Sequence, residues 1–116
     1  MPGCPLHILL VEDDEIDAEF IVRGFQQQGA QQPITVVGDG IEALARLRGL
    51  SGPAALAQPY LIITDINMPR MNGIELLREL RRDPRLAQSV VFVLKEAALE
   101  ADKLAAYEQL IAGYLL

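Results

Sequence analysis

The sequence has no tryptophan and a single cysteine, Cys4. One cysteine excludes an internal disulfide and a zinc site built from cysteines, and it fits a reducing compartment. The sequence also lacks an apolar run of the roughly 20 residues that a membrane-spanning helix needs. Its start, MPGCPLH, has no basic segment followed by a long apolar one, as a secretory signal would. We therefore expect a cytoplasmic protein that does not enter the membrane.

Positive charge is scarce. Ten lysines and arginines stand against 16 aspartates and glutamates, which gives a formal net charge of −6 at pH 7. An acidic domain repels the phosphates of nucleic acids and of anionic lipids, so we expect it to bind neither. Internal repeats and low-complexity tracts are absent as well. The 116 residues suit one domain with one core, and we expect residues 1–116 to form a single domain.

What the sequence does contain is an alternation of short apolar runs and longer amphipathic segments. Apolar runs that are separated by helices of this length indicate a parallel sheet covered on both faces. The predicted fold class is therefore α/β and doubly wound. The strands are expected at 7–11, 34–37, 60–64, 90–94 and 113–116, and the helices at 15–28, 40–50, 72–83 and 98–110.

Three of the expected helices carry apolar residues at helical spacing, which predict the side that packs on the sheet. Asp14 and Asp39 stand directly before two of these helices and are expected to cap their first turns. Arg81 and Arg82 end the third helix, where we expect a solvated pair that interacts favourably with the helix dipole. The expected inward residues are Ile16, Phe20, Ile21, Gly24, Phe25, Ile41, Leu44, Leu47, Ile74, Leu77 and Leu80.

Acidic residues stand at the ends of two expected strands. Glu12, Asp13 and Asp14 follow the first strand, and Asp65 follows the third. In open α/β sheets the ligand site lies beyond the carboxyl ends of the strands. If the two strands are neighbours, the carboxylates repel one another unless a cation neutralises them, and their hard oxygens suit Mg²⁺. Each acid alone could be a helix cap or a solvated strand end, but their coincidence favours a metal site.

The chain resembles the receiver domains of two-component response regulators, of the single-domain kind found in chemotaxis. The resemblance implies a five-stranded sheet of order 2-1-3-4-5 in which Asp65 is the phosphate-accepting aspartate. It also implies a Mg²⁺ site formed by Glu12, Asp13, Asp65 and the main-chain carbonyl of Asn67. The segments that carry the resemblance are LLVED (9–13), TDINMPRMNG (64–73), VVFVL (90–94) and AGYLL (112–116).

By the same resemblance, the protein is a signalling phosphoacceptor and not an enzyme in the usual sense. Asp65 would take a phosphoryl group from a histidine kinase or phosphotransfer protein as an acyl phosphate. The output would be a contact between a downstream protein and the face formed by the fourth helix and fifth strand. The sequence does not determine the oligomeric state, and a homodimer is compatible with it.

Two features depart from the receiver pattern. Receivers usually carry a serine or threonine at the end of the fourth strand, where this sequence has Lys95. The Lys95 ammonium could reach Asp65 or point into solvent, and the sequence favours neither. The family's lysine and last helix would follow Leu116, the last residue, and we expect the natural chain to continue there.

Three other functions are consistent with parts of the pattern. A pseudo-receiver would bind partners without phosphorylation, and Lys95 supports that alternative. A phosphohydrolase of the haloacid dehalogenase kind would carry its acidic pair as DxD after the first strand, which this sequence does not. An FMN-binding flavodoxin needs a phosphate loop rich in serine, threonine and glycine, whereas carboxylates stand there. The pseudo-receiver is the alternative that we carry forward.

Overall fold

The computed structural model describes residues 7–29, 32–49, 60–66, 68, 70–94 and 113–115. Every element expected in this part is present, with ends shifted by no more than two residues, whereas the expected helix at 98–110 lies outside it. None of the described helices is long and apolar enough to cross a bilayer. The elements are β1 (His7–Val11), α1 (Glu15–Gln27), β2 (Ile34–Val37), α2 (Gly40–Arg48), β3 (Tyr60–Thr64), α3 (Gly73–Arg82), β4 (Val90–Leu94) and β5 (Gly113–Leu115).

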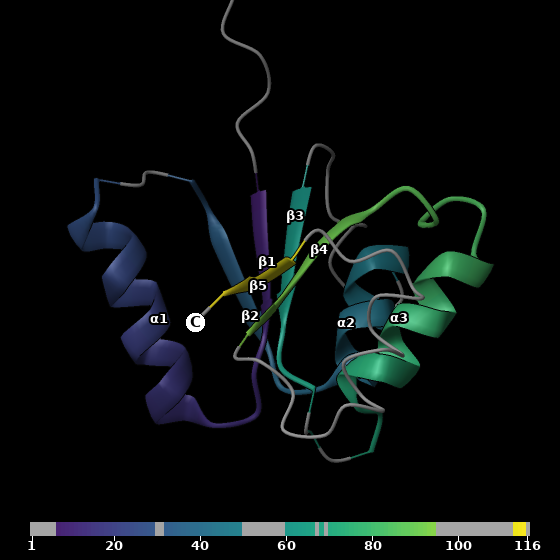
Figure 1. Cartoon of the computed structure of the whole chain (residues 1–116), viewed down its shortest axis with the longest axis horizontal. Coiled ribbons are helices and arrows are strands. Elements are labelled where there is room, and N and C mark those ends of the chain that lie inside the picture. The colour runs from purple at the N-terminus through teal and green to yellow at the C-terminus, as the bar shows by residue number, and fades with distance from the viewer. Residues whose placement is uncertain are drawn as a thin grey trace, which may run out of the picture.

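The strands form one parallel sheet, in which β2, β1, β3 and β4 lie in that order and β5 pairs with β4 (Figure 1). The predicted strand order is confirmed for β2-β1-β3-β4. The register places Val11 opposite both Val37 and Thr64, so β1, β2 and β3 end at the same edge. The order reverses between β1 and β3, because the chain first moves outward to β2 and then returns across β1. This reversal creates the crevice where such sheets bind ligands.

Helices cover both faces of the sheet, with α1 on one side and α2 and α3 on the other (Figure 1). Successive residues of a strand point to opposite faces. Ile8 and Leu10 therefore pack with α1, whereas Leu9 and Val11 pack with α2 and α3. All four are at most 3% exposed. The predicted α/β class, with a parallel sheet covered on both faces, is confirmed for the described elements.

The inward side of α1 differs from the prediction. Ile16, Phe20 and Gly24 were expected to face the sheet, but Ile16 and Phe20 are each 79% exposed and Gly24 is exposed as well, and Ile41 in α2 is 45% exposed. A helix buries only a stripe of its circumference, and the apolar residues of these helices extend beyond that stripe. The expected inward residues of α3 are all buried, as are Leu44 and Leu47 of α2. The residues of α1 that do pack on the sheet are Ala18, Ile21, Val22 and Phe25.

Polar side chains set the starts of the helices. Asp14, Asp39 and Asn72 are the N-cap residues of α1, α2 and α3, and each side chain accepts hydrogen bonds from main-chain N–H groups of the first turn. The capping roles predicted for Asp14 and Asp39 are therefore confirmed. Asn72 forms a reciprocal pair, because the Glu75 carboxylate accepts a hydrogen bond from its N–H (3.1 Å). The caps fix the helix starts at the edge of the sheet where the strands end.

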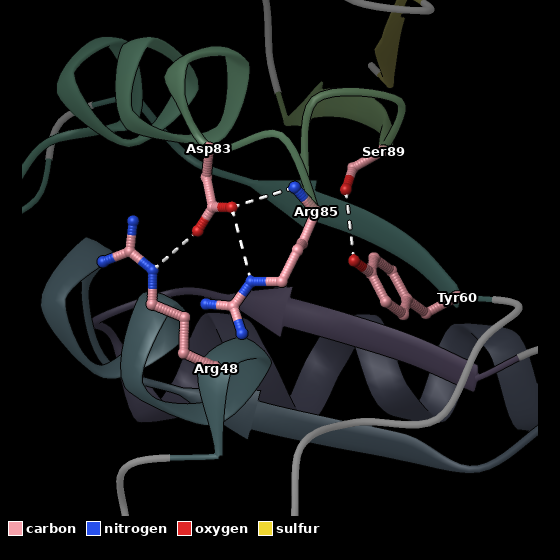
Figure 2. A network of polar contacts seen from close by, with 5 residues as sticks. All are labelled: Arg48, Tyr60, Asp83, Arg85 and Ser89. Carbon is pink, nitrogen blue, oxygen red and sulfur yellow. Dashed lines mark hydrogen bonds and ion pairs between the residues drawn. The ribbon is translucent and has the colours of Figure 1, made fainter.

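At the opposite edge, Asp83 joins the ends of α2 and α3 (Figure 2). Its Oδ2 accepts a hydrogen bond from Arg48 Nε (3.1 Å), and its Oδ1 accepts one from the main-chain N–H of Arg85 (2.9 Å). The hydroxyls of Tyr60 and Ser89 lie 3.2 Å apart beside this network. The Arg48–Asp83 pair ties α2 to the end of α3, and the Tyr60–Ser89 contact ties the start of β3 to the residue before β4. Both contacts lie at the edge of the sheet opposite Glu12 and Asp65.

Arg81 was expected to be solvated, and that prediction is wrong. Its guanidinium is partly buried and donates hydrogen bonds to the main-chain carbonyls of Ala87 (2.9 Å) and Ser89 (2.7 Å). Burial lowers the pKa of Arg81 from its ordinary value. The turn after α3 folds back over the helix end, and the side chain satisfies its carbonyls. Arg81 therefore has a structural role.

Candidate functional site

The acidic residues converge because β1 and β3 are neighbours that end at the same edge. Main-chain hydrogen bonds continue the ladder one residue past each strand: the Glu12 N–H donates to the Val37 carbonyl (3.0 Å), and the Asp65 N–H donates to the Val11 carbonyl (3.1 Å). Glu12 and Asp65 therefore leave the sheet side by side on hydrogen-bonded backbone. Their positions are set by the two central strands and not by a free loop.

Three carboxylates lie close enough to hold one metal ion. Glu12, Asp13 and Asp65 each offer one oxygen, and these oxygens lie within 4.8 Å of one another. Glu12 is buried, Asp65 is half-buried and Asp13 is exposed. The cluster thus reaches from the interior to the surface, where an ion could keep several water molecules. Oxygen ligands with such access suit Mg²⁺ and similar cations.

Glu12 shows the clearest fit to a cation. It is 3% exposed, its Oε1 accepts the main-chain N–H of Asp14 (3.1 Å), and its Oε2 is buried with no hydrogen-bond partner among the described residues. Burial raises the pKa of Glu12 to about 7; the Asp14 N–H opposes this shift, and the charges of Asp65 and Asp13 add to it. An unpaired buried oxygen beside two carboxylates costs free energy that a bound cation would offset.

The Asp65 carboxylate is held by the chain directly after it. Its Oδ1 accepts a hydrogen bond from the Ile66 N–H (2.8 Å), which among the described residues is the only group that donates to this carboxylate. Thr64, which is fully buried, donates its hydroxyl to the Asp65 main-chain carbonyl (2.9 Å). These two bonds orient Asp65, and no described residue donates a hydrogen bond to its Oδ2.

Gly73 lets α3 begin against the site. Its N–H donates to the Ile66 carbonyl (2.8 Å). A Cβ atom at this position would overlap the Asp65 carbonyl oxygen and lie 2.9 Å from the Ile66 Cα. Because these are main-chain atoms, only glycine permits the approach. Glycine at position 73, the first residue of α3, is therefore a steric requirement of the site.

A groove beside the cluster runs between α1 and the end of β2. Its lining is acidic, and its one arginine, Arg23, already pairs with Glu19 (2.5 Å). Such a surface attracts cations and repels anions. The acidic residues of the lining are Glu12, Asp13, Glu15, Glu19 and Glu42.

Of the predicted site residues, the structure brings Glu12, Asp13 and Asp65 together. Asn67 and Lys95 lie outside the described residues, and so do the side chains of the expected output face. Sequence analysis missed Arg70, whose Nε donates to Asp39 Oδ2 (2.5 Å). No local pattern connects two residues that stand 31 positions apart. The sequence signal that could have drawn attention to Arg70 is an arginine inside the turn after Asp65.

Comparison with known proteins gives the family. Residues 8–116 match the response regulator receiver domain. Response regulator Rcp1 of Synechocystis sp. is 32% identical over 111 residues, which cover 96% of this chain and 76% of that protein. The crystal structure of the phosphorylated cyanobacterial phytochrome response regulator RcpA superposes with a TM-score of 0.86 at 32% identity, over 97% of this chain and 80% of that one.

A second solved structure, the Mn²⁺-bound form of Rcp1, has a TM-score of 0.84 at 30% identity and covers 97% of this chain and 80% of its own. Sequence and structure therefore agree over almost the whole chain. The chain belongs to the response regulator receiver domains, which are phosphoacceptors of two-component signalling and not conventional enzymes.

Proposed function

We propose that this receiver domain accepts a phosphoryl group on Asp65 and relays the signal through a phosphorylation-dependent protein contact. The observation that carries the proposal is the convergence of Glu12 and Asp13 on Asp65, with an unpaired buried oxygen on Glu12. Receiver domains interact with histidine kinases, so the donor is a histidine kinase or a phosphotransfer protein. The phosphorylated form of RcpA supports the proposal by analogy.

In the proposed reaction, Asp65 Oδ2 attacks the phosphorus of a phosphohistidine. The new O–P bond forms as the N–P bond breaks, and the electron pair of the broken bond stays on the imidazole nitrogen. The product on this chain is an aspartyl phosphate, and the donor is left as a neutral histidine because the other ring nitrogen of its imidazole carries a proton. The Ile66 N–H holds Oδ1 during the attack, so that Oδ2 faces the donor.

We propose Mg²⁺ as the cation of the site. Glu12, Asp13, Asp65 and the main-chain carbonyl of Asn67 would hold it, as the convergence of the first three supports. When bound, Mg²⁺ would neutralise the negative charge that gathers on the phosphoryl oxygens during transfer. The Mn²⁺-bound form of Rcp1 shows that a relative binds a divalent cation.

The wider setting is part of the proposal. We infer a cytoplasmic single domain over residues 1–116, with the five-stranded order 2-1-3-4-5 completed by β5. Output would pass through the fourth helix and β5 to a downstream protein, with no nucleic acid or membrane bound. Lys95, at the usual serine or threonine position, would either face the phosphoryl group on Asp65 or point into solvent. A pseudo-receiver is the second candidate, because Lys95 replaces the hydroxyl that reports phosphorylation.

The test is phosphoryl uptake from acetyl phosphate with Mg²⁺, followed by intact-mass measurement of the full natural protein. Wild type should gain the mass of one phosphoryl group, and Asp65→Asn should gain none, because an amide keeps the shape but is no nucleophile. Asp14→Asn is the control: Asp14 caps α1 and lies outside the cluster, so uptake should continue. An unmodified wild type would favour the pseudo-receiver.

A further inference from the structure

The loop that joins β3 to α3 contains a residue in an unusual conformation. Arg70 has a φ of 63°, and among the described residues it is the one non-glycine residue with positive φ. Arginine has no intrinsic preference for this left-handed region, so its surroundings must hold it there. The contacts of the loop around Arg70 must therefore offset the cost of this conformation.

Those contacts are with the start of α2. Arg70 Nε donates to Asp39 Oδ2 (2.5 Å), and its terminal nitrogen contacts the same oxygen and lies 3.9 Å from Glu42. Asp39 is 4% exposed, and its Oδ1 caps α2 by accepting the Glu42 N–H (3.0 Å). One carboxylate thus holds the helix with one oxygen and the loop with the other. Pairing also compensates for the burial of that charge.

Met71 docks the same loop onto α2. The Gly40 N–H donates to the Met71 carbonyl (3.1 Å), and the Met71 side chain packs on Gly40. A Cβ atom on Gly40 would lie 2.7 Å from Met71 Cγ, which shows how close the packing is. The loop is therefore attached to α2 by an ion pair, a main-chain hydrogen bond and a packing contact.

The other attachment of the loop is Asp65 itself. The Ile66 N–H orients the Asp65 carboxylate, and the Ile66 carbonyl accepts the Gly73 N–H. Residues 70–73 thus connect α2 with Ile66, because Arg70 and Met71 contact the start of α2 and the Gly73 N–H bonds to the Ile66 carbonyl. This is the route by which loss of the Arg70 contact is expected to change the orientation of Asp65.

We propose that Arg70 is a positioning residue for the phosphorylation site: by binding Asp39 it fixes the loop that orients Asp65, and it thereby strengthens cation binding by Glu12, Asp13 and Asp65. This inference rests on the proposed function. It assigns to α2 a part in the site, although no residue of α2 belongs to the acidic cluster. Since coupling is reciprocal, a bound cation should in turn hold the start of α2 more firmly.

Whether removal of Arg70 weakens or tightens Mg²⁺ binding distinguishes a positioning role from a purely electrostatic one. Deleting a positive charge near a cation site should tighten cation binding, because repulsion between cations is relieved. Loss of the Arg70 contact should instead weaken Mg²⁺ binding by about tenfold, as removal of groups that orient metal ligands commonly does. A role confined to the cap of α2 would lower the thermal midpoint and leave the Mg²⁺ affinity of the folded protein unchanged.

The experiment compares Arg70→Ala, Arg70→Gly and Arg82→Ala by Mg²⁺ titration, followed by amide NMR shifts well below the thermal midpoint. Arg70→Gly removes the guanidinium but favours the positive φ, so it separates the contact from the backbone conformation. Arg82→Ala deletes an equal charge from an exposed position on α3. We expect weaker Mg²⁺ binding in both Arg70 variants and unchanged or slightly tighter binding in Arg82→Ala.

Hydrogen exchange of the Gly40 amide, which bonds to Met71, gives a second readout. Mg²⁺ should slow this exchange in wild type and not in Arg70→Gly. The inference would be overturned if Arg70→Gly and Arg82→Ala bound Mg²⁺ with equal affinity and if Mg²⁺ slowed exchange of the Gly40 amide in both variants. A wild type that binds Mg²⁺ but takes up no phosphoryl group would overturn the proposed function, while the Mg²⁺ comparison still decides the role of Arg70.

Discussion

Glu12 is buried beside the carboxylates of Asp13 and Asp65, and its Oε2 has no hydrogen-bond partner in the described part of the chain. Its pKa is raised from 4.5 to about 7, first by burial. An unfolded chain titrates near the ordinary value, so the folded protein binds a proton at Glu12 that the unfolded chain has lost. The resulting stabilisation is fully present below pH 4.5 and disappears as the pH rises through about 7. Without metal, neutral pH therefore leaves a buried, uncompensated charge.

Glu12→Gln should make the metal-free protein more stable relative to wild type as the pH rises from 5 towards 8, a range that spans the Glu12 pKa of about 7. The amide fits the same space and carries no charge. Urea unfolding in the presence of a chelator measures the difference at each pH. Glu19→Gln removes an exposed carboxylate from α1 and serves as the control. A difference for Glu12→Gln that does not grow with pH, beyond that of the control, would contradict the burial argument.

Lys95 stands where the resemblance to receivers leads us to expect a serine or threonine. If its ammonium lies near Asp65, Lys95→Thr should tighten Mg²⁺ binding, because opposite charges a few ångströms apart attract by roughly 1–4 kcal/mol and that competition is removed. If Lys95 points into solvent, screening keeps the affinity unchanged. Mg²⁺ titrations of both proteins at low and moderate salt decide between the two. Equal affinities at both salts would place Lys95 away from the site.

At the scale of helices and strands, replacement of two glycines by alanine should change stability in opposite directions. Gly24 lies inside α1, where an added Cβ atom would meet no other atom within 4 Å, whereas Gly73 abuts the main chain of Asp65 and Ile66. Gly24→Ala should raise the free energy of unfolding by about 0.5–1 kcal/mol, since alanine favours the helix. Gly73→Ala should lower it by about 1–3 kcal/mol, since α3 must move away from the site.

Urea unfolding of the two variants measures both effects, and each serves as the control for the other. Gly73→Ala should also weaken Mg²⁺ binding, because α3 and Ile66 move together through the Gly73 N–H. Gly24→Ala should leave Mg²⁺ binding unchanged. Equal stability of Gly73→Ala and wild type would show that the loop yields more easily than its contacts suggest.

The helices and strands were predictable from sequence because each depends on residues that are close together in the chain. Apolar runs gave the strands, and Asp14 and Asp39 marked the starts of helices by their capping chemistry. The orientation of α1 was less predictable, because apolar residues occupy more of its surface than the sheet covers. Ile16 and Phe20 were therefore placed wrongly. The Arg70–Asp39 contact was not predictable, because it depends on how two loops meet in space.

The site, too, has features that local sequence patterns predict and features that depend on contacts between distant parts of the chain. The acids at 12, 13 and 65 were visible as strand ends, but their convergence needs β1 and β3 to be neighbours, which came from the resemblance to receivers. The buried, unpaired state of Glu12 Oε2 followed from packing and had no sequence signal. Asn67 and Lys95, which lie outside the described residues, stay predictions.

At the scale of the whole molecule, a cation at the ends of β1 and β3 should stabilise the entire fold. A ligand that binds only the folded state adds about 2.7 kcal/mol to the free energy of unfolding at 100 times its dissociation constant. Urea unfolding with and without Mg²⁺ should show this gain in wild type. Asp65→Asn, which removes one of the three carboxylates, should show a smaller one. No gain in wild type would contradict the metal site.

The pairing of β1 with β3 has a consequence for how the site comes into being. Val11 lies opposite Thr64, 53 residues later, so the two halves of the acidic cluster meet only after a long chain segment has closed into a loop. Closing such a loop costs entropy that only the assembled sheet can offset. Before β1 pairs with β3, Asp65 does not lie beside Glu12 and Asp13, so the three carboxylates do not form a site. Mg²⁺ affinity should thus appear during refolding at the time when the central strands pair, and Mg²⁺ binding can report when that pairing is complete.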